Sequence, residues 1–241
     1  MGTFDGQVAV VTGASGGIGK AIALGLAEQG AALCIVGRQL ERLEEVAACA
    51  RARTSRVLSY RADLSLDQDI AKLNTDLRRD CGQLDILVHS AGIIFLGPLG
   101  QAPVEEFDKQ YRVNLRAPYA LTRALLPMIR SARGQIVFIN STVGLATRAN
   151  VAQFSATQHG LKAMADCLRE EVNPDGVRVL TVFPGRTATA RQAAIHQLEG
   201  RPYHPDRLLQ TRDVAAVVLN ALGLDRTAEV TDIRVRSLIK P

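Results

Sequence analysis

The sequence lacks any hydrophobic run long enough to cross a membrane, and it has few cysteines. Of its 241 residues 47% are hydrophobic, but no stretch of about 18 consecutive apolar residues occurs, so we expect no membrane-spanning helix. Residues 1–6 lack the basic start and apolar stretch of a signal peptide, and we expect none. The four cysteines, Cys34, Cys49, Cys81 and Cys167, show no paired spacing. We therefore predict reduced thiols, no metal site and a cytoplasmic protein.

A concentrated basic patch is also missing, although the formal net charge is +5. A basic balance can indicate nucleic-acid binding. Here the arginines are spread along the chain, and the one arginine-rich stretch, Arg38–Arg61, is interrupted by Glu41, Glu44 and Glu45. This pattern does not favour a nucleic-acid partner. An anionic small ligand accounts for the charge better.

Short apolar segments alternate with helical patterns from one end of the chain to the other. We expect strands at Gln7–Val11, Ala32–Val36, Arg56–Arg61, Leu84–His89, Gln135–Asn140, Val177–Phe183 and Val230–Val235. We expect helices at Gly19–Gln29, Leu40 to about Ala52, Leu66–Arg79, Val104–Leu126 with a kink at Pro118, Phe154–Glu171 and Arg212–Leu222. Strands without polar alternation, separated by helices, indicate a parallel sheet covered on both faces. The chain is therefore predicted to be a single doubly wound α/β domain over residues 1–241.

One long segment, Arg186–Gln210, shows neither a helical nor a strand pattern. It contains Gly200, Pro202 and Pro205 and follows closely on a predicted strand. Long irregular segments in compact domains are usually lids or binding loops. Ligands bind open α/β sheets beyond the carboxyl ends of the strands, so this segment is predicted to be a lid over the binding site.

A glycine-rich turn, Thr12–Gly19, joins the first predicted strand to the first predicted helix. Glycines let the backbone approach a pyrophosphate, and the helix N-terminus attracts its negative charge. The position between strand and helix makes this signal stronger than glycine spacing alone. The predicted nucleotide-binding residues of this turn are Gly13, Ser15, Gly17, Ile18 and Gly19.

The end of the second predicted strand indicates which nucleotide binds. An acidic residue there would accept a ribose hydroxyl and disfavour a 2′-phosphate, but this chain has Gly37 and Arg38. An arginine can clamp the phosphate through a forked, charge-assisted contact, to which Ser15 can add a hydroxyl. NADP(H) is therefore favoured and NAD(H) is the alternative. The other open interpretation is that Arg38 is simply a solvated side chain.

At this point the chain resembles the short-chain dehydrogenase/reductase family over essentially its whole length. The resemblance implies a Rossmann-type fold, a nicotinamide cofactor and hydride transfer with a small carbonyl or alcohol. Ser90-Ala91-Gly92 matches the family's Asn-Ala-Gly turn, with serine in place of asparagine. The further cofactor contacts that the resemblance implies are Asp63, Ser90, Ala91, Gly92, Gln158, Pro184, Gly185, Thr187 and Thr189.

The catalytic set that the resemblance implies is incomplete. Asn114 and Ser141 match the family's helix asparagine and catalytic serine. In relatives a Tyr-x-x-x-Lys pair begins thirteen residues after that serine, and these positions here are Phe154 and Gln158. The resemblance implies that the tyrosine donates the proton, while the lysine lowers its pKa and holds the cofactor ribose. Phe154 has no proton to give and Gln158 no charge, although the Gln158 amide can still hydrogen-bond a ribose hydroxyl.

Other side chains are poor substitutes for the missing pair. His159 lies one step along the same predicted helix, roughly 100° around it, and Lys162 lies about 6 Å further along the axis. His196 and Tyr203 lie on the predicted lid and could swing in. His89 ends a strand and is expected to pack beside the cofactor.

Three functions stay open. The favoured one is an NADP(H)-binding family member whose dehydrogenase or reductase turnover is absent or severely reduced. The first alternative is an active NADP(H)-dependent oxidoreductase with a non-standard proton donor, and the second is a structural or regulatory protein without nucleotide. Relatives pair through the helices that correspond to Val104–Leu126 and Phe154–Glu171, which implies a homodimer or homotetramer. The arginines of the predicted lid do not identify a substrate.

Overall fold

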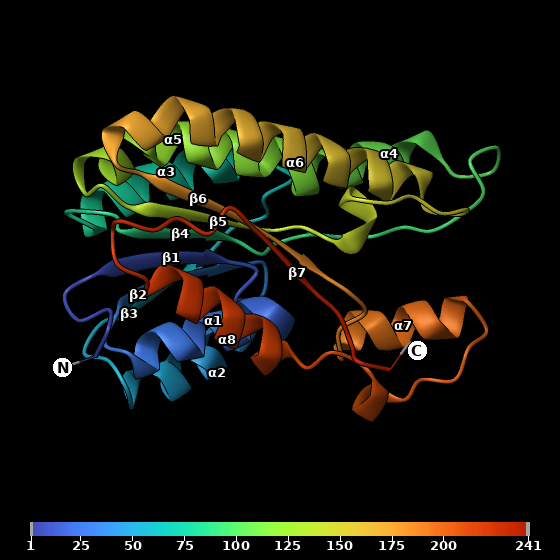
Figure 1. Cartoon of the computed structure of the whole chain (residues 1–241), viewed down its shortest axis with the longest axis horizontal. Helices are drawn as coiled ribbons and strands as arrows, with labels where there is room; N and C mark the ends of the chain where they lie inside the picture. Colours follow the sequence, from blue (N-terminus) through green and yellow to red (C-terminus); the bar gives the residue numbers. More distant parts are fainter. Residues whose placement is uncertain (1, 240–241) are drawn as a thin grey trace.

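Seven parallel strands form one sheet with helices on both of its faces (Figure 1). The computed structural model describes residues 2–239. The strands are β1 (Val8–Thr12), β2 (Ala32–Gly37), β3 (Val57–Arg61), β4 (Ile86–His89), β5 (Gln135–Ile139), β6 (Arg178–Pro184) and β7 (Asp232–Val235). Their order in the sheet is β3-β2-β1-β4-β5-β6-β7. The predicted single-domain, doubly wound fold of Rossmann type is confirmed.

The helices divide between the two faces of the sheet. They are α1 (Gly17–Glu28), α2 (Leu40–Arg51), α3 (Asp67–Asp80), α4 (Val104–Tyr111), α5 (Ala117–Ser131), α6 (Ala152–Val172), α7 (Ala190–Leu198) and α8 (Thr211–Leu222). One core packs α1, α2 and α8 against the sheet, and the other packs α3, α5 and α6 (Figure 1). Because both faces are covered, strands such as β4 are buried along their whole length. This explains the absence of polar alternation in the sequence.

The strand order reverses beside β1, which pairs with β2 on one side and with β4 on the other. The connections after β1 and β4 therefore leave the sheet in opposite directions and open a crevice at the carboxyl ends of these strands. Ligands of open α/β sheets bind at such a crevice.

The long helix predicted over Val104–Leu126 is interrupted just before Pro118, the residue at which a kink was considered possible. Between α4 and α5 lies a π-helical turn, η1 (Arg112–Arg116), and Pro118 stands in the first turn of α5. Pro118 has no N–H to donate, and the π-helical turn directly before it interrupts the α-helical hydrogen-bond pattern at the same place. Asn114 lies on the π-helical turn, a feature that is frequent at functional sites.

The segment 186–210 is more regular than predicted. It holds α7 and a short 3₁₀ turn, η4 (Pro205–Arg207). Thr189 caps α7, because its side-chain oxygen accepts a hydrogen bond of 3.1 Å from the backbone N–H of Gln192. The prediction of an irregular loop was wrong because the glycine and prolines that suggested it all follow this helix. In Figure 1, α7 stands apart from both helical layers.

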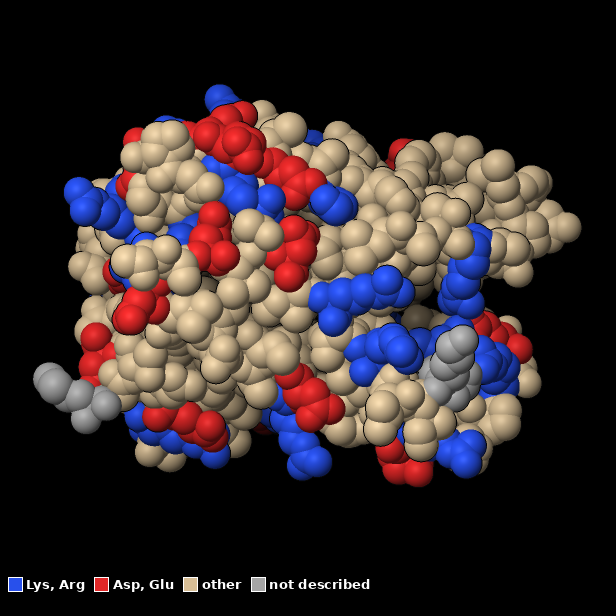
Figure 2. Space-filling view, in the orientation of Figure 1, with Lys and Arg blue, Asp and Glu red and all other residues tan. Residues whose placement is uncertain are grey.

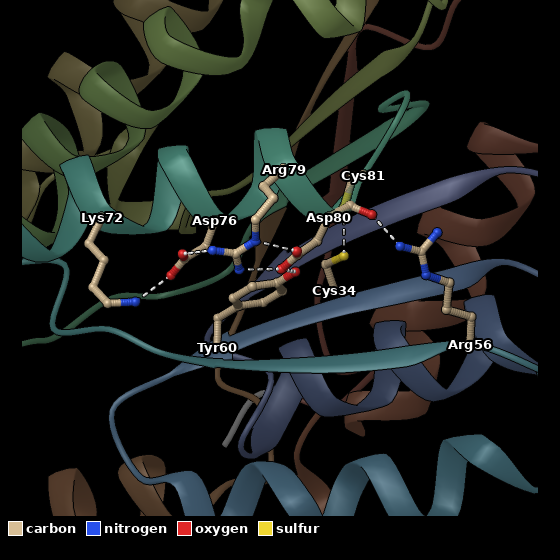
Figure 3. Close-up of polar contacts among 8 residues, drawn as sticks. All are labelled: Cys34, Arg56, Tyr60, Lys72, Asp76, Arg79, Asp80 and Cys81. Carbon is tan, nitrogen blue, oxygen red and sulfur yellow. Dashed lines mark hydrogen bonds and ion pairs between the residues drawn. The ribbon is translucent and has the colours of Figure 1, made fainter.

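Two of the four cysteines meet in the core although their spacing gave no sign of it. Cys34 of β2 and Cys81, directly after α3, are buried with their Sγ atoms 3.1 Å apart (Figure 3). The neighbouring Tyr60 donates a hydrogen bond of 2.9 Å to the Asp80 carboxylate. Contact with the Cys81 thiol and burial together raise the pKa of Cys34. All four cysteines are free thiols in the structure.

No helix within residues 2–239 has the length and apolar character that a membrane crossing requires. Over the same part of the chain, no group of three or more His, Cys, Asp or Glu side chains is placed to hold a metal ion.

Candidate functional site

A cavity of about 500 Å³ lies at the carboxyl ends of the central strands. This volume is within the usual range for small-molecule sites. Its walls include every residue to which the sequence assigned cofactor binding or catalysis: Gly13, Ser15, Gly17, Ile18, Gly19, Arg38, Asp63, Ser90, Ala91, Gly92, Asn114, Ser141, Phe154, Gln158, Pro184, Gly185, Thr187 and Thr189. The structure thus brings together segments from residue 13 to residue 189, and the individual roles of these residues remain predictions.

The glycine turn runs so close to its neighbours that side chains are excluded. Gly13 has a φ of +67°, and a Cβ there would lie 2.8 Å from the backbone of Ala91. A Cβ on Gly19 would lie 2.4 Å from the carbonyl oxygen of Gly13. These positions require glycine, and the turn leaves its backbone open to the cavity at the N-terminus of α1. This arrangement fits the pyrophosphate of a dinucleotide.

Thr12 ties the glycine turn to the turn after β4. Its Oγ1 donates to the carbonyl of Val88 (3.2 Å) and accepts from the backbone N–H groups of Ser90 (3.1 Å) and Ala91 (3.2 Å). One buried hydroxyl therefore fixes both walls of this part of the cavity.

Positive charge gathers where β2 ends. Arg38 lines the cavity there, and Arg42, in the first turn of α2, lines it as well. Arg191 on α7 reaches across to donate a hydrogen bond to the carbonyl of Gly92. Burial and the nearby charge of Arg38 lower the pKa of Arg191. The sequence-based prediction did not include Arg42, although its position four residues after Arg38 could have indicated it. The prediction also gave Arg191 no role in this site.

Asp63, after β3, is held in a tight local turn beside the same region. One of its carboxylate oxygens accepts hydrogen bonds from the backbone N–H (2.9 Å) and the hydroxyl (2.7 Å) of Ser65. The carboxylate is thereby fixed at the rim of the cavity.

Asn140 joins the end of β5 to α6 and so places Ser141. Its Oδ1 accepts a hydrogen bond of 2.7 Å from the Ser141 N–H, and its Nδ2 donates one of 2.9 Å to the carbonyl of Gln158. Asn140 is buried and lines the cavity. The sequence-based prediction gave it no role, because only the folded chain shows that its amide spans two elements.

Phe154 and Gln158 lie one turn apart on α6 and line the same cavity as Ser141. Phe154 is half-buried, and Gln158 is only 4% exposed. Among the described residues, no Tyr, Lys, Cys or Glu side chain lines this cavity. Outside its arginines, the titratable groups of the lining are Asp63 and His89.

Asn114 on η1 connects two parts of the cavity wall through the hydrogen bonds of its side chain. Its side chain is 2% exposed. Its Oδ1 accepts from the N–H of Ile93 (2.8 Å), and its Nδ2 donates to the carbonyl of Ile93 (2.9 Å) and to Oγ1 of Thr157 (3.3 Å). It therefore holds the loop after β4 against α6.

The two candidate substitutes on α6 point elsewhere. Nδ1 of His159 lies 2.9 Å from the carbonyl oxygen of Ser155, one turn earlier. Nζ of Lys162 donates to the carboxylate of Asp166 at 2.5 Å. Neither side chain lines the cavity.

The candidates on the 186–210 segment pack against each other. His196 is 3% exposed, its Nδ1 lies 2.9 Å from the carbonyl oxygen of Gln192, and its ring meets that of Tyr203 edge-on at 5.4 Å. Neither ring lines the cavity, although Gln192 does.

His89 borders the cavity from a buried position. Its Nε2 lies 2.8 Å from Oγ1 of Thr122, and its ring stacks on Phe138 at 5.0 Å. Burial lowers its pKa to about 3. An imidazole in this state is neutral at physiological pH and is a poor proton donor.

Comparison with known proteins gives one consistent result. Residues 7–200 match the model of the family described as short chain dehydrogenase. An uncharacterized oxidoreductase from Staphylococcus aureus is 30% identical over 98% of this chain and 99% of its own length. The structure of a metagenomic short-chain oxidoreductase in complex with NADP is 32% identical with a TM-score of 0.85, covering 99% of this chain and 100% of that one. An alcohol dehydrogenase from the archaeon Thermococcus sibiricus, complexed with 5-hydroxy-NADP, is 27% identical with a TM-score of 0.89, covering 98% of both chains.

Proposed function

The chain belongs to the short-chain dehydrogenase/reductase family, and we propose that it binds NADP(H) but has little or no ordinary dehydrogenase or reductase turnover. One observation carries this proposal. The cavity gathers the predicted nucleotide-binding residues, while Phe154 and Gln158 line it from α6. The sequence resemblance assigns these two positions to the family's tyrosine and lysine.

The fit to a dinucleotide phosphate rests on shape and charge. A Cβ at Gly13 or Gly19 would collide with neighbouring backbone, so the turn leaves room for the pyrophosphate. Arg38 and Arg42 line the cavity at the end of β2, where the 2′-phosphate of NADP would lie, and no acidic residue follows β2 directly. The solved relatives complexed with NADP or 5-hydroxy-NADP support the same choice.

The missing chemistry is the transfer of a proton. NADPH supplies the hydride when it is bound, and the alkoxide that forms must then be protonated. A positioned general acid typically contributes a factor of about 10²–10⁴ to the rate. Phe154 cannot donate a proton, and Gln158 has no charge with which to stabilise the oxyanion. Ser141 can hydrogen-bond a small carbonyl or alcohol, but its hydroxyl is too weak an acid to replace tyrosine.

The geometry does not support any of the other side chains considered as a proton donor. His159, Lys162, His196 and Tyr203 lie outside the cavity lining. The low pKa of His89 keeps its imidazole neutral. We therefore keep the non-catalytic function as the proposal.

The same proposal covers motion and assembly. The 186–210 segment would act as a lid, because α7 contributes Arg191 and Gln192 to the cavity wall and stands apart from the helical layers. The chain would form a homodimer or homotetramer through the helical segments 104–126 and 154–171, where Tyr119 and Ala156 are exposed. Light scattering after size exclusion would report a monomer if this assembly is wrong.

Calorimetric titration with NADP⁺, NADPH and NAD⁺ tests the cofactor proposal. We expect NADP⁺ and NADPH to bind more tightly than NAD⁺. Gly19→Ala should weaken binding strongly, because the added methyl meets the Gly13 carbonyl. Gly82→Ala is the matched control, because a Cβ there has nothing within 4 Å. If the folded native chain binds no nucleotide, or if both variants bind like it, the proposal is wrong.

A further inference from the structure

Two arginines of the cavity wall share one carboxylate. Arg148, in the loop between Ser141 and α6, and Arg186, directly after Gly185, both line the cavity. Nη2 of Arg186 donates to both carboxylate oxygens of Glu199 at 2.8 and 2.6 Å, and Nη2 of Arg148 lies 3.3 Å from one of them. Arg201 lies 3.8 Å from the same carboxylate. Three guanidinium groups therefore surround one negative charge.

Glu199 remains ionised in this cluster. Burial by itself raises the pKa of its carboxyl group, but hydrogen bonds and the charges of Arg186 and Arg148 outweigh burial and hold the pKa below its ordinary value. The single negative charge of Glu199 thus offsets only part of the positive charge of Arg186 and Arg148. Figure 2 shows Lys and Arg side chains gathered around the hollow between the lobe that contains α7 and the rest of the molecule.

One nitrogen of Arg186 has no partner. Nη1 is buried, and it makes no hydrogen bond to any of the residues that the structure describes. A buried N–H group of a charged side chain is costly to leave unpaired. Arg186 itself lines the cavity, so it brings an incompletely paired guanidinium group to the cavity wall.

We propose that this part of the cavity binds the carboxylate of an oxo acid or hydroxy acid through the guanidinium groups of Arg186 and Arg148. A guanidinium group matches a carboxylate in charge and in planar, forked geometry. The two arginines lie on the segments that also carry Ser141 and Gly185, so the carboxylate would orient the carbonyl or alcohol end of the same molecule within the site. This inference rests on the proposed function, because it names the ligand class of the same cavity.

Matched ligand pairs test the inference. Pyruvate, levulinate and benzoylformate would each be compared with their methyl esters, which keep the carbonyl and lose the charge. Binding would be measured by calorimetry on the full chain, both free and saturated with NADP⁺. At least one acid should bind about tenfold more tightly than its ester, as expected for a charge-assisted contact. Equal affinity within all three pairs would overturn the inference.

Arginine variants locate the contact. Arg186→Met should abolish the preference for the acid, and Arg148→Met should reduce it. Arg148 is 49% exposed, so its variant provides the test even if Arg186→Met fails to fold. Arg212→Met, at an exposed position of α8 outside the cavity lining, should keep the preference. A preference that persists in both cavity variants would contradict the assignment.

The same titrations separate the two proposals. If NADP⁺ does not bind but the free protein still prefers the acids, the nucleotide proposal fails and the carboxylate site stands. If NADP⁺ binds and the acids show no preference, the carboxylate site fails and the nucleotide proposal stands.

Discussion

Gln158 follows Phe154 by one turn of α6, and both side chains line the cavity that Ser141 also borders. Residues four apart on a helix share a face, so the two positions act on the same space. Phenylalanine keeps the ring of a tyrosine, and glutamine keeps much of the stem of a lysine. Under the proposed correspondence with the family's tyrosine and lysine, the pair preserves the packing of the helix but supplies neither a proton nor a charge.

Arg38 should decide the nucleotide preference. Arg38→Ala is expected to weaken NADP⁺ binding by about 10- to 100-fold, because a charge-assisted hydrogen-bonded contact contributes about 1.5–3 kcal/mol. NAD⁺ binding should change little, since NAD⁺ lacks the 2′-phosphate. Fluorescence titration with both nucleotides measures the two effects. Arg51→Ala, an exposed arginine at the end of α2, is the control and should leave both affinities unchanged. Equal losses for NADP⁺ and NAD⁺ in Arg38→Ala would show that Arg38 does not read the phosphate.

His89 should make the protein less stable at mildly acidic pH. Its pKa is about 3 in the folded protein and 6.5 as the ordinary value, which applies to the unfolded chain. Between these values the unfolded state binds more protons, so stability falls as the pH is lowered. From pH 7 to pH 5 this one group should cost about 2 kcal/mol of unfolding free energy.

Urea unfolding at pH 7 and pH 5 measures this loss. Carboxylates with lowered pKa values, such as Asp76 and Glu199, should contribute little to the change in unfolding free energy between pH 7 and pH 5. Their stabilising effect is lost at lower pH. His89→Gln should remove most of the pH dependence, and His204→Gln, at an exposed position, should retain it. An unchanged pH dependence in His89→Gln would rule out His89 as its source.

The cysteines should react in two classes. Cys49 and Cys167 are exposed, whereas Cys34 and Cys81 are buried against each other. The raised pKa of Cys34 keeps that residue a thiol. Contact with Cys34 lowers the pKa of Cys81, but burial excludes the reagent from both members of the pair, so neither should react in the folded protein. A thiol-specific chromogenic disulfide should titrate Cys49 rapidly, whereas Cys167, on the α6 face assigned to assembly, should react rapidly only in the monomer. The buried pair should react only after unfolding. Cys49→Ser with Cys167→Ser should eliminate the rapid phase, and a rapid phase that survives this change would contradict the packing.

The sheet and the cofactor end could be predicted because their signals are local. Continuous apolar segments such as Val8–Thr12 predict strands of a sheet that is buried on both faces. Gly13, where a side chain would collide with neighbouring backbone, follows one predicted strand within two residues, and Arg38 follows the next in the same way. Both signals can therefore be read from residue type and position alone. For this reason the predicted cofactor residues all reached one cavity.

The rest depends on contacts between segments far apart in the chain. Cys34 meets Cys81 across 47 positions, and the Asn140 amide joins two elements that become neighbours only on folding. The link between Arg186 and Glu199 likewise requires α7, a helix whose pattern was obscured by the glycine and prolines that follow it. No periodicity or motif encodes such partners.

The most direct test of the account is NADPH oxidation by the chain as it stands and by the double variant Phe154→Tyr, Gln158→Lys, with the same panel of small ketones, aldehydes and oxo acids. We expect turnover of the variant to exceed that of the native chain by at least about 100-fold, the effect of a restored general acid. Both proteins should bind NADPH. Comparable turnover by the native chain would contradict the central claim, because it would show that the proton reaches the substrate without a tyrosine at position 154.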